Sequence, residues 1–255
     1  MVYKKIIFYI IGVILILSLI IKFFQATTNN FIIKEDKNFK NSTFINNIKG
    51  CGKKENENGI RKNKSIVVIE NSKDIFVTNG TFSCTNKSIF YVDNSKNLII
   101  SNINASKGSD NVLQVDNSFS IIKDSTISFN ENNKCIEGDN GIIILSNNII
   151  KNCTIGLEIE KNDNSNYTAI VLLNNEFKDI KQNIIRCFDN KEAGQGKIYL
   201  FTKNNRLNKT PYFGTKHPCL NKIDINKNLE DAILNNNFQK IQILIEELIF
   251  DFKKI

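Results

Sequence analysis

Short apolar runs alternate with clusters of polar residues through the middle of the chain. One polar cluster has the form Asp-Asn-Ser or a close variant and begins at Glu70, Asp93, Asp116, Asp139, Asp163 and Asp189. The intervals between these positions are 23, 23, 23, 24 and 26 residues. A second polar corner recurs at Asn79, Asn102, Asp124, Asn147, Asn174 and Asn204. Two landmarks with nearly one period indicate a solenoid of repeated units.

The repeated unit consists of strands. Apolar runs such as residues 66–69 and 98–100 are short, and Asn, Asp, Ser and Gly residues bound them. This arrangement is typical of short strands joined by tight turns. The fixed Leu frame of leucine-rich repeats and the 3.6-residue period of helical repeats are both missing from the sequence. One unit cannot bury its apolar face alone, so the units are expected to stack as the rungs of a solenoid.

The rung length and the corner asparagines resemble the right-handed parallel β-helix of the pectate-lyase-like superfamily, the carbohydrate-binding and sugar-hydrolase type. The resemblance covers about residues 63–209 and implies an all-β solenoid of about six or seven rungs. Corner side chains on successive rungs would lie about 4.8 Å apart and could hydrogen-bond from one rung to the next. Enzymes of this group are polysaccharide lyases, hydrolases and epimerases, so the resemblance implies a carbohydrate ligand.

One strand column is apolar on both faces. It contains Phe76, Ile99, Ile121, Ile144, Val171 and Phe201, and many of the flanking positions are apolar too. Alternate residues of a strand point to opposite faces, and parallel strands that are apolar on both faces need cover. Residues 228–255 show helical spacing, with Asn228 as the expected cap and a division into two helices allowed at residues 235–237. This amphipathic segment is predicted to pack on the column, with oligomerisation or a partner contact as the alternative.

The N-terminal segment predicts a membrane anchor. Lys4 and Lys5 precede the uncharged run 6–21, and Lys22 closes it. Paired lysines at this place favour a cytoplasmic N-terminus, with the bulk of the chain outside the membrane, in the periplasm or at the cell surface. The bulky Phe24 disfavours cleavage by signal peptidase, so a single-pass signal anchor is preferred over a cleaved signal peptide.

The predicted organisation therefore has five parts. Residues 1–25 form the anchor, and residues 26–62 form a linker with an N-terminal rung. The solenoid follows at 63–210, then a loop at 211–227 and the helical segment at 228–255.

Six cysteines become informative in an exported chain. They are Cys51, Cys84, Cys135, Cys153, Cys187 and Cys219, and no two form a CxxC pair. Zinc and thioredoxin-type sites are therefore disfavoured. An oxidising compartment permits disulfides, with about 15 connectivities for six cysteines. Buried free thiols are the alternative.

The charge pattern limits the partners. The formal net charge is +8, but no basic cluster alternates with aromatic residues as a nucleic-acid groove requires, so nucleic acid is not expected. Carboxylates at the corners could hold Ca²⁺. A hydrogen-bonded ladder is the preferred interpretation of these residues, because every rung carries the motif. No metal or other cofactor is therefore predicted.

One polar row precedes the first corner and is the candidate site. It contains Tyr91, Gln114, Glu137, Glu158 or Glu160, and Arg186. Tyr91 offers a ring face to a sugar, Gln114 can donate and accept hydrogen bonds, and Arg186 could hold an acidic sugar. Carboxylates of Glu137 and its neighbour would lie about 5 Å apart, a separation that retaining glycosidases use. The alternative is a solvated strand face on which Arg186 neutralises the glutamates.

The motifs leave enzymatic activity undecided. The only histidine, His217, lies beyond the rungs, and the paired aspartates, His and Arg-x-Lys of polygalacturonase-type hydrolases are missing. The sequence predicts a membrane-anchored extracytoplasmic β-helix protein that binds or modifies polysaccharide. The alternative is a non-catalytic structural or adhesive surface protein. The oligomeric state does not follow from the sequence.

Overall fold

The structure is a computed structural model of the 255-residue chain. It describes residues 31–34, 42–45, 49–50, 67–83, 88–106, 111–129, 133–160, 167–188, 197–207 and 220–254. The predicted anchor at 1–25 and His217 lie outside these residues. Among the helices that the structure does describe, none is both long and apolar enough to cross a membrane.

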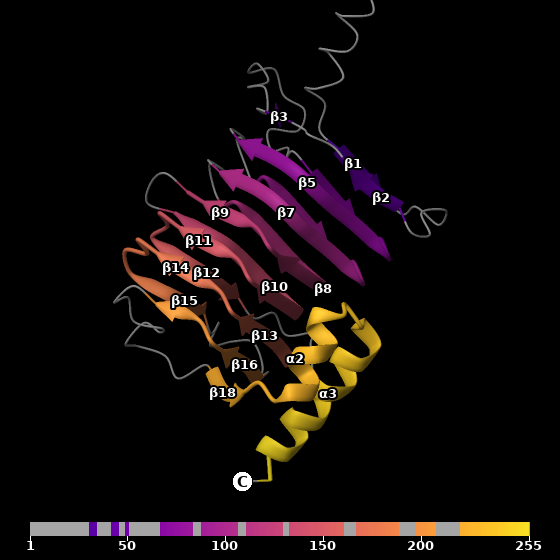
Figure 1. The fold of residues 1–255 in the computed structure, drawn as a ribbon, viewed down its shortest axis with the longest axis vertical. Coiled ribbons are helices and arrows are strands. Elements are labelled where there is room, and N and C mark those ends of the chain that lie inside the picture. The colour runs from indigo at the N-terminus through magenta and orange to yellow at the C-terminus, as the bar shows by residue number, and fades with distance from the viewer. Residues whose placement is uncertain are drawn as a thin grey trace, which may run out of the picture.

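The described chain winds into a parallel β-solenoid, as the repeat predicted (Figure 1). All its strand pairs are parallel and form three faces, called here the first, second and third sheets. The first sheet contains β1 (Phe31–Lys34), β4 (Val67–Glu70), β6 (Phe90–Asp93), the first parts of β8 (Leu113–Lys123) and β10 (Lys134–Ser146), β12 (Ile155–Glu160) and β15 (Asn183–Phe188).

The other two sheets complete each rung. The second contains β2 (Ser42–Ile45), the first parts of β5 (Ile75–Ser83) and β7 (Leu98–Ser106), the last parts of β8 and β10, β13 (Tyr167–Leu173), β16 (Lys197–Lys203) and β18 (Leu220–Asp224). The third contains β3 (Lys49–Gly50), the last parts of β5 and β7, β9 (Thr126–Ser128), β11 (Ile149–Lys151), β14 (Glu176–Lys178) and β17 (Arg206–Leu207).

The solenoid has about five turns. From Val67 to Lys178, each turn contributes a strand segment of three residues or more to all three sheets. The next turn closes with the two residues of β17, and β3 is equally short. The sequence predicted six or seven rungs, so the number of complete turns is smaller than expected.

The corners form where the sequence placed them. All six predicted second-corner residues, from Asn79 to Asn204, have a positive φ between 51° and 58°. Asn and Asp tolerate this left-handed conformation better than other residues with a side chain. Neighbouring corners are hydrogen-bonded, since Nδ2 of Asn147 donates to Oδ1 of Asp124 at 3.1 Å and Nδ2 of Asn174 to Oδ1 of Asn147 at 3.2 Å. The predicted corner ladder is thus confirmed at these rungs.

The apolar residues divide into two cores, as the two-faced strand column predicted. One core fills the interior of the solenoid and includes Ile100, Ile122 and Leu145. The second lies outside the second sheet and includes Ile99 and Ile144 of the strands. Alternation along each strand sends neighbouring isoleucines into different cores.

Two helices cover the outer core. They are α2 (Lys227–Leu234) and α3 (Phe238–Phe252), and Figure 1 shows them against β13 and β16. Ile241, Ile245 and Ile249 of α3 are buried there, which confirms the predicted packing. The helices divide at residues 235–237, where the sequence allowed it.

The predicted cap at Asn228 is wrong. The N-cap is Asn226, whose Oδ1 accepts from the backbone N of Leu229 at 2.9 Å, and Asn228 already lies inside α2. The chain leaves β18 at Asp224, so the helix begins two residues earlier than the apolar spacing suggested.

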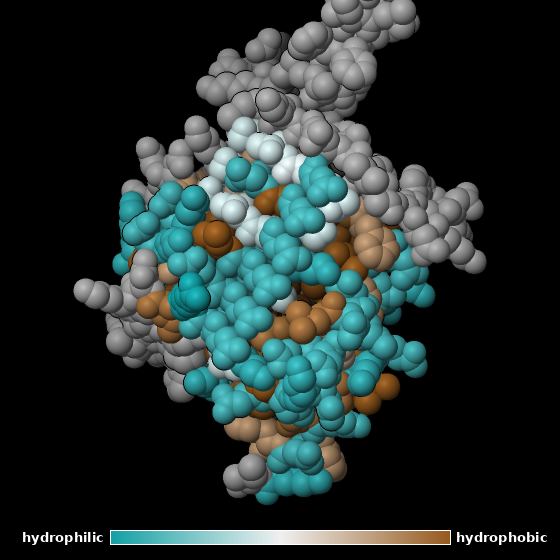
Figure 2. Space-filling view, in the orientation of Figure 1, coloured by the Kyte–Doolittle hydropathy of each residue, from teal (hydrophilic) through white to brown (hydrophobic). Residues whose placement is uncertain are grey.

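The large apolar side chains that remain exposed among the described residues all lie on the helices. They are Leu234, Ile243, Phe250 and Phe252. On the face shown in Figure 2, hydrophilic residues cover most of the described surface, and apolar residues form small separate patches. Single exposed apolar residues of this kind are ordinary on a protein surface.

Candidate functional site

The candidate row is aligned across five strands of the first sheet. Tyr91 of β6 pairs with Gln114 of β8, which pairs with Glu137 of β10. Glu137 pairs with Glu158 of β12, and Glu158 with Arg186 of β15. The register therefore places Glu158 in the row. Glu160 lies two positions further along β12 and pairs with Asp139.

Glu158 is the most buried member of the row, with 1% of its side chain exposed. Its Oε1 lies 2.5 Å from Nζ of Lys134, and its Oε2 contacts both Nε and an Nη of Arg186. A buried carboxylate is tolerated when cations and hydrogen bonds compensate it. Both oxygens of Glu158 are thus occupied by neighbouring side chains.

Glu137 joins the same cluster from the adjacent strand. Its Oε2 lies 3.1 Å from Nζ of Lys134 and also accepts a hydrogen bond from Nδ2 of Asn111. The Oδ1 of Asn111 in turn accepts a hydrogen bond from the hydroxyl of Ser88. Burial disfavours the charge of Lys134, but hydrogen bonds from Lys134 to Glu158 and Glu137 outweigh that effect and raise its pKa. The ammonium group therefore stays charged and holds the two glutamates together.

Lys134, Asn111 and Ser88 were missed as site residues in the sequence. Each lies three residues before a member of the candidate row, namely before Glu137, Gln114 and Tyr91. This constant offset is a signal that the repeat contained. It marks a second polar position at the entrance of β6, β8 and β10.

A row of carboxylates runs beside the candidate row, two positions closer to the first corner. Glu70, Asp93, Asp116 and Asp139 are paired in register on successive strands. Burial raises the pKa of Asp116 to about 7, and the charges of Asp139, Asp93 and Glu137 add to the increase. A hydrogen bond from Gln114, at 2.8 Å, acts in the opposite direction.

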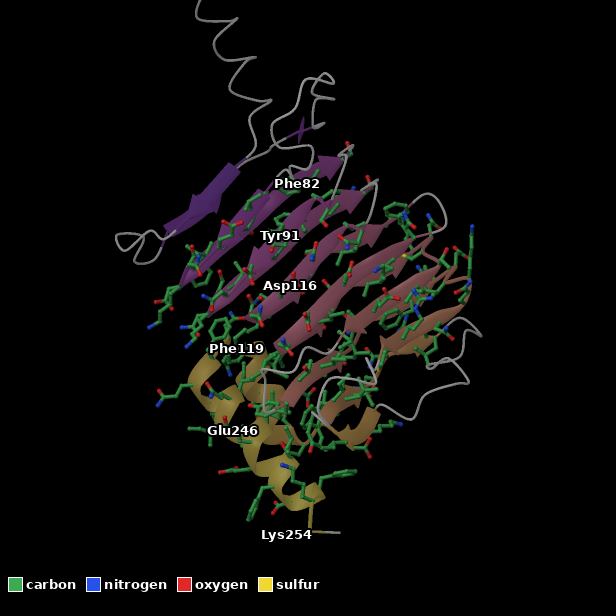
Figure 3. All side chains as sticks on the ribbon, turned by 180° about the vertical axis from the view of Figure 1, so that it is seen from behind. Phe82, Tyr91, Asp116, Phe119, Glu246 and Lys254 are labelled. Carbon is green, nitrogen blue, oxygen red and sulfur yellow. A yellow bond between two sulfur atoms is a disulfide. The ribbon has the colours of Figure 1, made fainter. Side chains whose placement is uncertain are left out.

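Tyr91 stands next to these carboxylates. Figure 3 shows Tyr91 and Asp116 above the helices. Phe119, by contrast, lies beside the helices, and its ring centroid is 4.9 Å from that of Phe238. Burial, followed by the charges of Asp93, Asp116 and Glu70, raises the pKa of Tyr91 to about 12. Its hydroxyl is therefore protonated at any physiological pH and can donate a hydrogen bond.

The arrangement changes the chemistry expected of the row. Arg186 is paired with Glu158 through two of its nitrogens, so it is poorly placed to hold an acidic sugar. The face combines Glu137, Glu158 and the four carboxylates from Glu70 to Asp139 with two cations, Lys134 and Arg186. It is thus acidic, although the whole chain carries a net charge of +8. Within the described ranges, no group of three or more His, Cys, Asp or Glu side chains is arranged to hold a metal ion.

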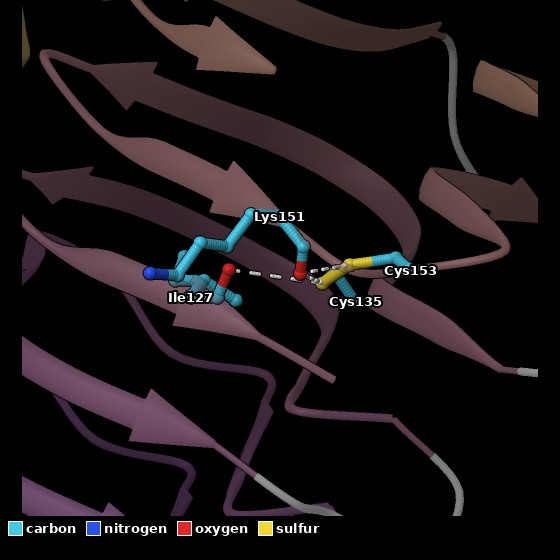
Figure 4. The surroundings of a disulfide bond; sticks show 4 residues. All are labelled: Ile127, Cys135, Lys151 and Cys153. Carbon is cyan, nitrogen blue, oxygen red and sulfur yellow. Dashed lines mark hydrogen bonds between the residues drawn. A yellow bond between two sulfur atoms is a disulfide. The ribbon is translucent and has the colours of Figure 1, made fainter. Parts of the chain in front are cut away.

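A disulfide joins two fully buried cysteines at the corner between the third sheet and the first (Figure 4). It joins Cys135 of β10 to Cys153, which lies between β11 and β12, and the two Cα atoms are 5.6 Å apart. Sγ of Cys135 lies 3.8 Å from the carbonyl oxygen of Ile127 and 3.7 Å from that of Lys151. Cys187 is also disulfide-bonded. The disulfide interpretation is therefore the correct one for these three cysteines.

Comparison with known proteins adds no relative. No family model, no curated protein and no solved structure matches the chain. The assignment of the fold therefore depends on the parallel strand pairing itself.

Proposed function

We propose that the protein is an exported β-helix protein that binds a polysaccharide chain along the outer face of the first sheet. The observation that carries the proposal is the register of Tyr91, Gln114 and Glu137 on successive strands. Side chains at matched positions repeat at the strand spacing of about 4.8 Å. An extended glycan is also a linear repeat, so it can contact several rungs in the same way.

The charge of this face selects among glycans. Arg186 and Lys134 are occupied by Glu158 and Glu137, whereas carboxylates continue along the neighbouring row. Carboxylates accept hydrogen bonds from sugar hydroxyls and attract amino groups, and they repel acidic sugars. We therefore expect a neutral or amino-bearing chain to be the ligand.

The same geometry favours binding over cleavage. Glu158 is buried between two cations, whereas a general acid must be able to reach the substrate. Glu137 is held by Lys134 and Asn111. Asp116, whose pKa is raised to about 7, is the group of this face that is best suited to proton transfer. Among the described residues its side chain is hydrogen-bonded to Gln114, whose amide is not a nucleophile.

Membership of the pectate-lyase-like superfamily and attachment to the membrane by residues 6–21 belong to the same proposal. The disulfide between Cys135 and Cys153 supports export, because structural disulfides persist in oxidising compartments. Protease added to intact spheroplasts should digest the solenoid domain if the bulk of the chain faces outward. Complete protection in intact spheroplasts, followed by digestion after lysis, would contradict this orientation.

The binding test uses the full chain in detergent and three immobilised polymers: a neutral glucan, a partly deacetylated amino-sugar polymer and an acidic polygalacturonate. We expect binding to the first or second polymer and none to the third. Tyr91→Ala should weaken binding about tenfold, because it removes the ring on which a sugar can stack. Tyr91→Phe keeps the ring and serves as the matched control.

The alternative function is that of a non-catalytic structural or adhesive surface protein. The observation that favours it is the pairing of Glu158 with Lys134 and Arg186. These ion pairs join adjacent strands, and the paired groups are not available to bind a ligand. If none of the three polymers binds, or if Tyr91→Ala binds as well as the wild type, this alternative is preferred.

A further inference from the structure

A second ladder of asparagines lies buried at the corner between the second and third sheets. It contains Asn148, Asn175 and Asn205, one from each of three successive rungs. Oδ1 of Asn175 accepts from the backbone N of Asn148 at 3.0 Å, and Oδ1 of Asn205 accepts from the backbone N of Asn175 at 2.9 Å. Each rung thus supplies a carboxamide oxygen to the backbone N–H group of the rung before it.

The Nδ2 groups of this ladder repeat in the same way. Nδ2 of Asn175 donates to the carbonyl oxygen of Leu145, and Nδ2 of Asn205 donates to that of Leu172, both at 2.8 Å. The unit of the ladder is therefore a complete amide, whose carbonyl accepts and whose nitrogen donates. Asn148 and Asn175 are each 1% exposed, so the corner is shaped to enclose such a group.

The ladder ends at Asn205 because the chain changes direction. The pairing of Thr202 with Asp224 places Asn226 and Lys227 level with Asn204 and Asn205. Lys227 therefore stands where the next ladder residue would be, and it begins α2 with Asn226 as its N-cap, so no carboxamide continues the ladder beyond Asn205. Among the described residues, no protein group accepts a hydrogen bond from the backbone N–H of Asn205.

A hollow of about 440 Å³ occupies this end of the ladder. Its lining residues are Thr202, Lys203, Asn204, Asn205, Lys222, Asp224 and Ile225. Lys203 is paired with Glu230 at 2.8 Å, and the rim combines Lys222 with Asp224. The charges of the hollow are therefore balanced, which favours a neutral ligand over an anion or a cation. Its volume lies in the range of small-molecule pockets.

We propose that this hollow binds the acetamido group of an N-acetylated sugar. The carbonyl of the acetamido group takes the place of the missing carboxamide oxygen and accepts from the N–H of Asn205. The sugar ring lies in the outer part of the hollow, between Lys222 and Asp224, whose side chains meet its hydroxyls. This site is separate from the Tyr91 row and does not depend on the function proposed for that row.

Saturation-transfer NMR on the full chain in detergent tests the proposal. The ligands are the β-linked dimers of N-acetylglucosamine, glucosamine and glucose. We expect the acetyl methyl protons to receive the strongest saturation. We also expect the two dimers without an acetyl group to bind at least about tenfold more weakly, since a site built around an amide discriminates against ligands that lack it. Equal binding of the glucosamine dimer, or no binding of the acetylated one, would overturn the proposal.

Two variants locate the site. Lys222→Trp and Asp224→Trp each place a large ring in the hollow from an exposed position on β18, and both should lower affinity for the acetylated dimer at least about tenfold. Lys240→Trp changes an exposed lysine of α3 outside the hollow and should have no effect. Tyr91→Ala should also leave this affinity unchanged, which separates the hollow from the row. Undiminished binding in both β18 variants would place the ligand elsewhere and reject the assignment.

Discussion

The first and second sheets share one solenoid and one interior core, yet their outer faces are opposite in character. On the first sheet, outward positions carry Tyr91, Gln114 and Glu137, which form a polar row. On the second, the outward column includes Ile99 and Ile144 and is covered by α2 and α3. Interior packing constrains only every second residue of a strand, so the outward residues can differ between the two sheets without disturbing the interior core. The contrast shows how one repeat produces a structural face and a surface available for recognition.

The two faces also stabilise the fold by different means. The apolar face depends on elements from outside the repeat, because each fully buried Ile contributes about 1.5–3 kcal/mol only when the helices exclude water from it. On the polar face, ion pairs within and between rungs compensate the charges, such as those of Lys134 with Glu137 and Glu158. Removing the cover should therefore be far more damaging than changing a polar pair.

The largest effect is expected from deleting the cover. A chain that ends after Asn226 lacks both helices and leaves the outer core, including Val171 and Phe201, open to water. An exposed apolar face of this extent should cause aggregation and binding of a hydrophobic dye. The measurement is dye fluorescence together with sedimentation. A truncated chain that is as soluble and as stable as the complete one would show that the second sheet does not need its cover.

A point substitution in α3 sharpens the same comparison. Ile245 is fully buried in the outer core, whereas Ile243 on the same helix is 48% exposed. Ile245→Ala should lower the free energy of unfolding by about 4 kcal/mol, and Ile243→Ala by about 1 kcal/mol or less. Denaturant unfolding of both variants measures the difference. Similar losses at the two positions would mean that packing against the sheet is not what stabilises α3.

The polar face is tested at Glu158. Glu158→Gln removes the charge that compensates Lys134 and Arg186, and it should lower the free energy of unfolding by about 3 kcal/mol. Glu176→Gln is the matched control, because Glu176 is a partly exposed glutamate paired with Lys178 at 3.0 Å and should cost less than about 1 kcal/mol. If Glu158→Gln unfolds at the same denaturant concentration as the wild type, the cluster does not hold the rungs together.

The smallest effect concerns the pH dependence of the carboxylate row. The pKa of Asp116 is raised in the folded state, so the unfolded chain releases this proton first, near pH 3.8, and the folded chain near pH 7. The contribution of Asp116 to stability is therefore complete below pH 3.8 and is lost as the pH rises through about 7. Asp116→Asn should raise the free energy of unfolding by about 2 kcal/mol at pH 8 and change it little at pH 3.

Unfolding of the Asp116 variant is followed at both pH values, with Asp124→Asn as an exposed carboxylate control on the second corner. An equal change at pH 3 and pH 8 would contradict a raised pKa at Asp116. Stabilisation by Asp124→Asn of the same size would show that the effect is not specific to the row.

Much of this architecture could be predicted because a parallel repeat keeps one period. An interval of 23 residues between Asp93 and Asp116 and between Asp116 and Asp139 is enough to place these residues on one line of strands. The same reasoning aligned Tyr91, Gln114 and Glu137. It left Glu158 and Glu160 undecided, because the later rungs contain longer intervals, and only the strand pairing selected Glu158.

The sequence by itself thus determined the repeat, the corners, the two-faced second sheet and the need for a helical cover, because these depend on spacing and on the alternation of strand residues. The tertiary structure decided which groups satisfy one another. It paired Cys135 with Cys153, surrounded Glu158 with Lys134 and Arg186, and ended the buried asparagine ladder at Asn205. The physical reason is that a period sets the level of each residue along the solenoid. Side-chain reach, burial and the path of the chain after the last rung set its contacts.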